Sequence, residues 1–195
     1  MARFFEVHKP GSMADRAVTQ ILNTGTARVD AVALGPWNIK GKRIQYRRQK
    51  TKRSNGMLVS IPIHDDLMEV IEALPDDRTF LATQQGNARA AASLGNAMRR
   101  WCDAAGLKVC SAHGLRKACA RRLAEAGATA HEVGAVTGHK TLKLVQLYTE
   151  AAGREGMADS AFDKLISRPN GEQKLVNVPG RFAKIEPESI EGKQK

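Results

Sequence analysis

Apolar residues recur at the three-to-four-residue spacing of α-helices over most of the chain. In the first such stretch, Ser12 precedes a stripe of apolar positions and Asp15 stands in the first turn, a pattern typical of a helix start. Thr24 and Gly25 interrupt that stripe. The same pattern predicts further helices at residues 28–34, 65–74, 92–105, 112–126, 130–137 and 141–152.

One region between these helices has the composition of β-strands instead. Ile39 and the runs 43–47 and 57–61 predict three short strands, and residues 54–56 (Ser-Asn-Gly) supply the positive φ angles that a tight hairpin requires. Residues 79–83 are interpreted as a further short strand or an extended link. The expected fold class is therefore α+β and mainly α: a helical domain with a small three-stranded antiparallel sheet, or hairpin, in its N-terminal third.

A chain of 195 residues fits one domain, with or without a tail. After Arg168 the composition changes, because proline and glycine recur at 169–171 and 179–180 and the last residues are polar. We expect a domain over residues 1–168 and a C-terminal tail or arm over 169–195. Its scattered apolar residues allow a short docking strand, and disorder is the alternative.

Charge is distributed unevenly along the chain. The formal net charge is +11, and no acidic residue occurs between Ala31 and His64. The basic residues of that stretch are Lys40, Lys42, Arg43, Arg47, Arg48, Lys50, Lys52 and Arg53. Such one-sided charge suits contact with nucleic-acid phosphates, and less often with an anionic membrane surface. A soluble basic protein without such a partner is the alternative.

The sequence does not indicate membrane insertion or secretion. No apolar run approaches the roughly 18 residues that span a bilayer, and the first twelve residues lack the apolar core of a secretory signal. The three cysteines are odd in number and have no C-x-x-C pairing, so reduced, buried thiols are expected instead of disulfides or a zinc site. We therefore expect a cytoplasmic protein.

Three elements near the C-terminus carry candidate chemistry. His113 and Arg116 are three residues apart, so a helix places them on one face. Gly138 lets the chain turn at His139, and Tyr148 follows nine residues later. Arginine matches two phosphate oxygens, histidine moves protons near neutral pH, and cations favour the nucleophilic phenolate of tyrosine. Each element alone is more often a solvated face, a helix cap or core packing; the ordered set suits phosphoryl transfer.

The segment from Ala112 to Ala152 resembles the C-terminal signature of the tyrosine recombinases, the phage-integrase family. The family pattern is H-x-L-R, then a helical stretch, then G-H, then a nucleophilic tyrosine nine residues on, and all of it is present here. Upstream, ILNTGTARVDAVAL resembles the family's first arginine box. RRQKT resembles its β-hairpin lysine, followed by the strand that ends in IPI. The resemblance covers roughly residues 10 to 155.

The resemblance implies a role for each matching residue. Tyr148 attacks the scissile phosphate and forms a 3′-phosphotyrosyl link with a free 5′-hydroxyl. Arg116 and a partner arginine clamp the non-bridging oxygens, and Lys50 protonates the leaving 5′-oxygen. His113 acts as acid and base, and His139 supports the transition state. The family needs no metal and no cofactor, because the covalent link keeps the bond energy for rejoining.

The chain departs from the family pattern at the first arginine. The box usually reads T-G-x-R-x-x-E, which places that arginine at Ala27, while the acid at its end is Asp30. Either a shift of the turn after Gly25 lets Arg28 serve, or the first arginine is lost; we favour Arg28.

The basic hairpin supplies two further sets of candidates. Lys50, followed by a threonine, is favoured over Lys52 as the family's hairpin lysine. Non-specific DNA phosphate contacts are assigned to the remaining cations, with solvated charges as the alternative: Arg47, Arg48, Lys52 and Arg53.

The resemblance also sets the expected partners. These are double-stranded DNA and further recombinase protomers in a synaptic tetramer, with the isolated domain a monomer and no membrane involved. Full-length members carry a helical N-terminal DNA clamp, which we expect to be missing here, and we therefore expect weak DNA binding with little site preference. A bacterial cytoplasm, in association with the nucleoid, is the expected location.

The function predicted from the sequence is that of a site-specific recombinase or integrase catalytic domain from a phage or mobile element. The activity of this chain alone stays open. A relative that binds DNA but is catalytically impaired is the main alternative, motivated by Ala27. A type IB topoisomerase, with the same nucleophile and cations, is a more remote one.

Overall fold

The computed structural model describes residues 2–49, 56–139, 143–150 and 154–166. The chain divides into two compact units, residues 1–157 and 158–195, and each is described by itself. The first unit carries every element that concerns the candidate site. Of the second unit, the described residues are 158–166, which continue a helix.

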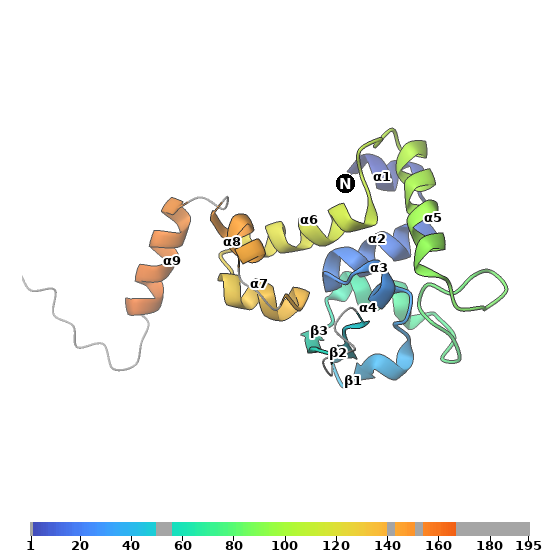
Figure 1. Ribbon diagram of the computed structural model, residues 1–195, viewed down its shortest axis with the longest axis horizontal. Helices are drawn as coiled ribbons and strands as arrows, with labels where there is room; N and C mark the ends of the chain where they lie inside the picture. The colour runs from blue at the N-terminus through green and yellow to red at the C-terminus, as the bar shows by residue number, and fades with distance from the viewer. Residues whose placement is uncertain (1, 50–55, 140–142, 151–153, 167–195) are drawn as a thin grey trace, which may run out of the picture. The chain divides into compact units, whose positions relative to one another are not determined.

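The first unit is mainly helical and includes a small antiparallel sheet (Figure 1). The strands pair in the order β1-β2-β3. In chain order the elements are α1 (Ala2–Val7), α2 (Met13–Thr24), α3 (Arg28–Ala31), the 3-10 helix η1 (Pro36–Asn38), β1 (Ile39–Lys40), β2 (Arg43–Arg47), β3 (Leu58–Pro62), α4 (Asp65–Glu72), α5 (Ala91–Ala104), α6 (Ala112–Glu125), α7 (Ala130–Thr137), α8 (Lys143–Glu150) and α9 (Arg154–Ile166). The predicted α+β class is confirmed.

The sheet forms where the sequence predicts it. In the β2–β3 pair, Ile44 lies opposite Ile61 and Tyr46 opposite Val59. These four side chains are buried, whereas alternate positions of both strands are exposed or half-buried, as the two-residue period of a strand requires. They form one core cluster with apolar residues of α4, so one face of the sheet rests on that helix.

Helix α2 begins and ends at the predicted residues. The Ser12 side chain accepts a hydrogen bond from the main-chain N–H of Asp15 at 3.2 Å and so caps the first turn. Gly25 ends the helix with a φ of +60°, and its N–H donates to the carbonyl of Ile21 at 2.9 Å. The chain can therefore turn sharply at the start of the arginine box.

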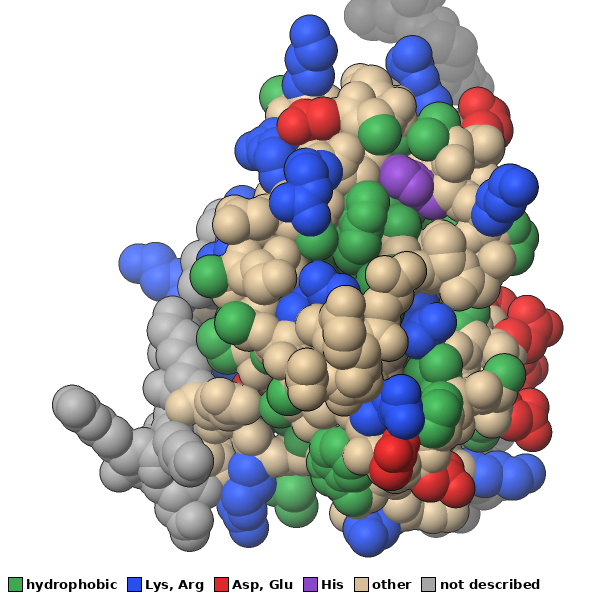
Figure 2. All heavy atoms as spheres, turned by 90° about the vertical axis from the view of Figure 1, so that its right-hand side faces the viewer, with side chains coloured by type: hydrophobic (Ala, Val, Ile, Leu, Met, Phe, Trp, Pro, Cys, Tyr) green, Lys and Arg blue, Asp and Glu red, His purple; other side chains and the backbone are tan. Residues whose placement is uncertain are grey.

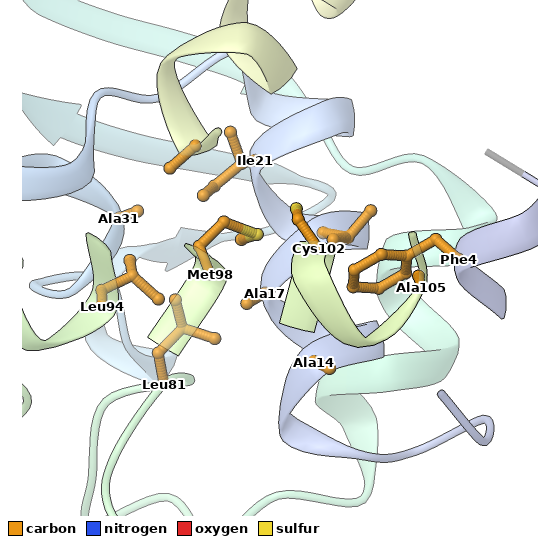
Figure 3. Packing of buried hydrophobic residues seen from close by; sticks show 12 residues of the cluster. Phe4, Ala14, Ala17, Ile21, Ala31, Leu81, Leu94, Met98, Cys102 and Ala105 are labelled. Carbon is orange, nitrogen blue, oxygen red and sulfur yellow. The ribbon is translucent and has the colours of Figure 1, made fainter. Parts of the chain in front are cut away.

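A second core cluster joins α2 to α5. Figure 3 shows side chains of the two helices facing each other, with contributions from α1 and from the link before α5. Its members include Phe4, Ala14, Ala17, Ile21, Leu81, Leu94, Met98 and Cys102. This packing fixes α2, and with it the turn at Gly25, within the first unit.

Some expectations differ from the structure. Helices α1 and α9 were not predicted, and α3 ends at Ala31, three residues before the predicted end. Residues 79–83 contain no strand and form a link with a turn at its centre, so the expectation of a strand is wrong and that of a link holds. Cys102 and Cys119 are buried, but Cys110 is exposed, so the expectation of three buried thiols is wrong. Within the described residues, every helix is too short or too polar to cross a membrane.

Candidate active site

Arg116 lies at the centre of the candidate site. It belongs to α6, whose N-terminus is capped by the Ser111 side chain, which accepts from the N–H of Gly114 at 3.2 Å. The Arg116 side chain is only 6% exposed, and its Nη1 donates to the main-chain carbonyl of Gly25. The guanidinium therefore joins α6 to the turn that opens the arginine box.

His139 reaches the same guanidinium from another helix. Gly138 ends α7 with a φ of +68°, and the N–H groups of Gly138 and His139 both donate to the carbonyl of Gly134. This turn directs the imidazole to Arg116, whose Nη2 lies 3.2 Å from His139 Nε2. The sequence therefore predicted correctly that Gly138 allows a turn at His139.

The hydrogen bonds of His139 define its tautomer. The Thr137 hydroxyl donates its one proton to the carbonyl of Val133 at 2.7 Å, so it can only accept from His139 Nδ1, 2.6 Å away. Arginine can only donate, so His139 Nε2 must accept from Arg116. The ring is therefore neutral, with its proton on Nδ1.

Electrostatics favour the same neutral form. Burial, followed by the positive charges of Arg116 and Arg48 and by His113, lowers the pKa of His139 to about 4. Burial and the charge of Arg48 also lower the pKa of the Arg116 guanidinium from its usual value. His139 is thus an uncharged acceptor that orients Arg116 in this state of the site.

Arg48 belongs to this site, although the sequence grouped it with the outer cations of the hairpin. Its side chain is only 9% exposed, so the alternative of a solvated charge is wrong for this residue. Arg48 Nη1 donates to the carbonyl of Gly138, and Nε lies 3.8 Å from Oδ2 of buried Asp30. The strand parity explains the burial, because Ile44, Tyr46 and Arg48 alternate onto the inner face.

Asp30 holds the end of β2 against the arginine box. Its Oδ1 accepts from the N–H of Gln49 at 2.9 Å, while Oδ2 faces Arg48. The carboxylate is buried and lies on α3, three residues after Ala27. The arginine box and the basic hairpin are separate motifs in the sequence, but in the structure they are in direct contact through Asp30.

His113 and Arg28 lie on a neighbouring depression. It has a volume of about 380 Å³ and is also lined by Arg99. Both side chains are exposed, and the Arg28 guanidinium lies over the backbone of Gly95 on α5, where an added Cβ would meet it. The hydrogen bonds of the site thus bring Arg116, His139 and Arg48 together. His113 lies at the start of α6 on the depression that Arg28 also lines, and its charge contributes to the lowered pKa of His139.

The other predicted site residues are described in part or not at all. Tyr148 lies on α8, and its side chain is outside the described part of the structure. Helix α8 packs on α6 and α7 through buried Val145, so it rests on the two helices that carry Arg116 and the turn at His139. Lys50, Lys52 and Arg53 lie outside the described residues. Arg47 is exposed, and its Nη1 donates to the carbonyl of Gly56 at 3.1 Å.

Tyr46 is a member of the site that sequence reasoning missed. Burial and the carboxylate of Asp30 raise the pKa of its phenol above the ordinary value, while Arg116 and Arg48 oppose that rise. Among the described residues, its hydroxyl has no hydrogen-bond partner. Its place on the inner face of β2 is the signal that could have found it.

Basic side chains are spread over the surface outside this site. On the face that includes α5, Lys and Arg side chains are scattered, and acidic side chains lie mainly along the right-hand and lower edges, with a few near the top (Figure 2). Within the described residues, no cluster of three His, Cys, Asp or Glu side chains could hold a metal ion.

Comparison with known proteins identifies the class of domain and then the family. The fold is that of integrase catalytic domains, as the matches to solved structures show. Residues 2–155 match the profile of the Phage integrase family, and the chain belongs to this family. Comparison with curated protein sequences gave no match.

Three solved structures illustrate the likeness. A lambda integrase dimer bound to a COC′ core site matches with a TM-score of 0.64 and 19% identity, over 78% of this chain and 58% of that one. XerA recombinase gives 0.63 and 14%, over 86% and 61%. The Tn1549 transposon integrase, in complex with transposon right end DNA, gives 0.59 and 16%, over 78% and 58%. The chain therefore corresponds to about three fifths of each of these chains.

Proposed function

We propose that this chain is the catalytic domain of a site-specific DNA recombinase that cuts and rejoins double-stranded DNA through Tyr148. The observation that carries the proposal is the bond between Arg116 and His139. It joins two motifs 23 residues apart at one point, on the helices against which α8 packs. Arg116 is buried and held at two of its nitrogens, so its charge is fixed in place before DNA arrives.

The proposed reaction exchanges one phosphoester for another. The hydroxyl oxygen of Tyr148 attacks the scissile phosphorus, and the bond from phosphorus to the 5′-oxygen breaks. The product is a 3′-phosphotyrosyl link and a 5′-hydroxyl, with Lys50 supplying the proton of the leaving oxygen. Arg116 neutralises charge on the non-bridging oxygens, and His113, exposed at the start of α6, accepts the proton that the Tyr148 hydroxyl loses as its oxygen attacks. A 5′-hydroxyl attacks in the reverse direction and rejoins the strand.

The sequence contains two tyrosines, and the site disfavours one of them. Tyr46 is buried with a raised pKa, so its phenolate is costly and its oxygen is enclosed. Tyr148 stands on α8, at the family spacing from His139. The nucleophile is therefore assigned to Tyr148.

The proposed partners are double-stranded DNA and further copies of the recombinase. Lambda integrase is known as a dimer on a core site and as a tetramer on a Holliday junction, which suggests the same kind of assembly here. Arg47, Lys52 and Arg53 are proposed to contact the DNA backbone around the site. Since the substrate is DNA, we place the protein with the nucleoid in a bacterial cytoplasm.

Covalent trapping on nicked DNA tests this function. Wild-type protein is incubated with nicked duplexes of randomised sequence, in which the strand beyond the nick is lost after cleavage, so the adduct accumulates. We expect a band that survives denaturation in wild type and in Tyr46→Phe and that is absent in Tyr148→Phe. An adduct that persists in Tyr148→Phe contradicts the assignment. DNA binding without any adduct identifies the catalytically impaired relative instead.

A second assay separates recombination from topoisomerase activity. The trapped sequences are placed in pairs on a plasmid and incubated with the protein. Exchange between the two sites is expected of a recombinase. Relaxation of supercoils without exchange would identify a type IB topoisomerase.

A further inference from the structure

The arginine box leaves one electrostatic requirement unmet. A pentacoordinate phosphorane carries negative charge on its non-bridging oxygens, and the site proposed above provides Arg116 for it. The box position that would hold a second arginine is Ala27, whose side chain is a methyl group. The neighbouring Arg28 extends over Gly95 of α5, in the depression beside the site.

A second buried guanidinium nevertheless lies beside Arg116, and it comes from the hairpin. Arg48 is held on one side by the Gly138 carbonyl, next to His139, and on the other by Asp30, three residues after Ala27. Its aliphatic stem fills the space at Gly138, since a Cβ added there would lie 2.6 Å from Arg48 Cδ. The absence of a side chain at Gly138 is therefore what admits Arg48 to the site.

The charge balance of this cluster favours an anion. Arg48 and Arg116 are both buried, and Arg48 is among the groups that lower the pKa of Arg116 and of His139, which places the three groups within electrostatic range. Among the described residues, Asp30 is the carboxylate that pairs with Arg48 and that also acts on the pKa of Arg116. Two like charges beside one carboxylate repel each other, and a bound phosphodiester would offset that repulsion.

We propose that Arg48 replaces the first arginine of the box and neutralises the second non-bridging oxygen of the scissile phosphate. The role rests on the proposed function. The hydrogen bond to Gly138 and the ion pair with Asp30 fix the guanidinium before DNA binds, as preorganised charge stabilisation requires. The charge that the family carries on its arginine box is thus supplied here by the end of β2, and Arg28 is left to line the outer depression.

A neutral phosphate analogue tests this role. In a methylphosphonate, an uncharged methyl group takes the place of one non-bridging oxygen, so the need to neutralise that oxygen disappears. The probes are two nicked duplexes of one trapped sequence, one with the normal scissile phosphodiester and one with a methylphosphonate at that position. The rate of covalent adduct formation is measured on each.

The expected result is a selective rescue. Arg48→Gln should slow adduct formation on the phosphodiester on the order of 10²- to 10³-fold, the usual effect of losing one transition-state donor, and less than about tenfold on the methylphosphonate. Arg121→Ala, an exposed arginine on the far part of α6, serves as the matched control and should follow wild type on both substrates. Arg28→Ala should change the ratio of the two rates by less than about threefold.

Several results would overturn the role of Arg48. One is an equal slowing of Arg48→Gln on both substrates with an unchanged melting temperature, which would show that Arg48 does not neutralise the non-bridging oxygen. Selective rescue of Arg28→Ala would instead assign the role to Arg28. If Arg48→Gln fails to fold, Arg48→Lys keeps the charge and should react at the wild-type rate on the methylphosphonate but more slowly on the phosphodiester. No adduct from wild type on either substrate would overturn the proposed function and the role together.

Discussion

Nη2 of Arg116 donates to Nε2 of His139 at 3.2 Å, so the lone pair of the imidazole faces a guanidinium in the structure described. In this arrangement the histidine holds Arg116 in place through an acceptor nitrogen and offers no Nε2 proton to a phosphate. The proton is on Nδ1, which the Thr137 hydroxyl accepts at 2.6 Å. His139 is therefore a positioning residue in this state, and Thr137 determines its tautomer.

Replacing Thr137 with valine should allow His139 to adopt its other neutral tautomer. The change removes the acceptor for Nδ1–H and leaves a similar shape, so His139 should populate the Nε2–H form and turn from Arg116. The nitrogen chemical shifts of the ring distinguish the two tautomers. The loss of two buried hydrogen bonds should also cost about 1–2 kcal/mol of unfolding free energy.

The control for Thr137→Val is Thr19→Val. Thr19 is another buried threonine, whose hydroxyl contacts Asp15 at 3.3 Å. The Thr19→Val variant should lose stability without a change in the ring nitrogen chemical shifts of His139. Unchanged ring nitrogen shifts in Thr137→Val would contradict the assigned tautomer.

The depressed pKa of His139 predicts a loss of stability in mild acid. Its pKa is about 4 in the folded protein and 6.5 in the unfolded chain, so the folded state binds fewer protons between these values. The stability that the neutral His139 ring contributes to the folded state is fully present above pH about 6.5 and is lost as the pH falls towards 4. Because His139 is half-buried and partly screened by water, we expect a difference of about 1 kcal/mol between pH 7.5 and pH 5.

Urea unfolding of wild type and His139→Gln at the two pH values measures this effect. Wild type should lose more stability than the variant, since glutamine does not titrate. An equal loss in the two proteins would assign the acid sensitivity to other groups.

The sequence predicted most helices and strands because their signals are local. Ser12 caps α2, Gly25 and Gly138 end two helices, and apolar spacing marks the faces that pack. Helix α1 was missed because six residues with one buried side chain, Phe4, give no recognisable period. The side chains described for α9 are mainly exposed, so its sequence carries no clear apolar stripe.

Prediction of the site stopped where tertiary contacts begin. His113, Arg116, His139 and Tyr148 could be identified from the sequence, because their spacing along the chain matches the family motif. Arg48, in contrast, is one of eight basic residues in a stretch that contains no acidic residue, and no local feature marks it as buried. Its partners come from 18 residues earlier, at Asp30, and 90 residues later, at Gly138. The inward parity of Ile44 and Tyr46 was the one available signal.

Tyr46→Phe should not destabilise the protein. The Tyr46 hydroxyl is buried and has no hydrogen-bond partner among the described residues, and burying such a group costs about 1–3 kcal/mol. Removing the oxygen should therefore leave the unfolding free energy unchanged or raise it by about 1 kcal/mol. Thermal and urea unfolding measure the change. A loss above about 1 kcal/mol would mean that the hydroxyl makes a bond with water or with a group outside the described residues.

Gly138→Ala tests the close approach of Arg48 to the turn at His139. Gly138 has a φ of +68°, and Gly41, on the β1–β2 turn, has a φ of +58°, so alanine is strained at both positions. At Gly41 an added Cβ meets nothing within 4 Å, whereas at Gly138 it would lie 2.6 Å from Arg48 Cδ and 2.9 Å from Val59 Cγ2.

The difference between these two variants isolates the packing contribution. Gly41→Ala should cost about 1 kcal/mol for the left-handed backbone alone. Gly138→Ala should cost a further 1–3 kcal/mol for overpacking and should displace Arg48, so adduct formation slows in this variant only. Urea unfolding and covalent trapping are measured on both variants. Equal losses of stability with equal rates would contradict the packing of Arg48 against Gly138, since the only remaining effect would be the backbone strain that the two positions share.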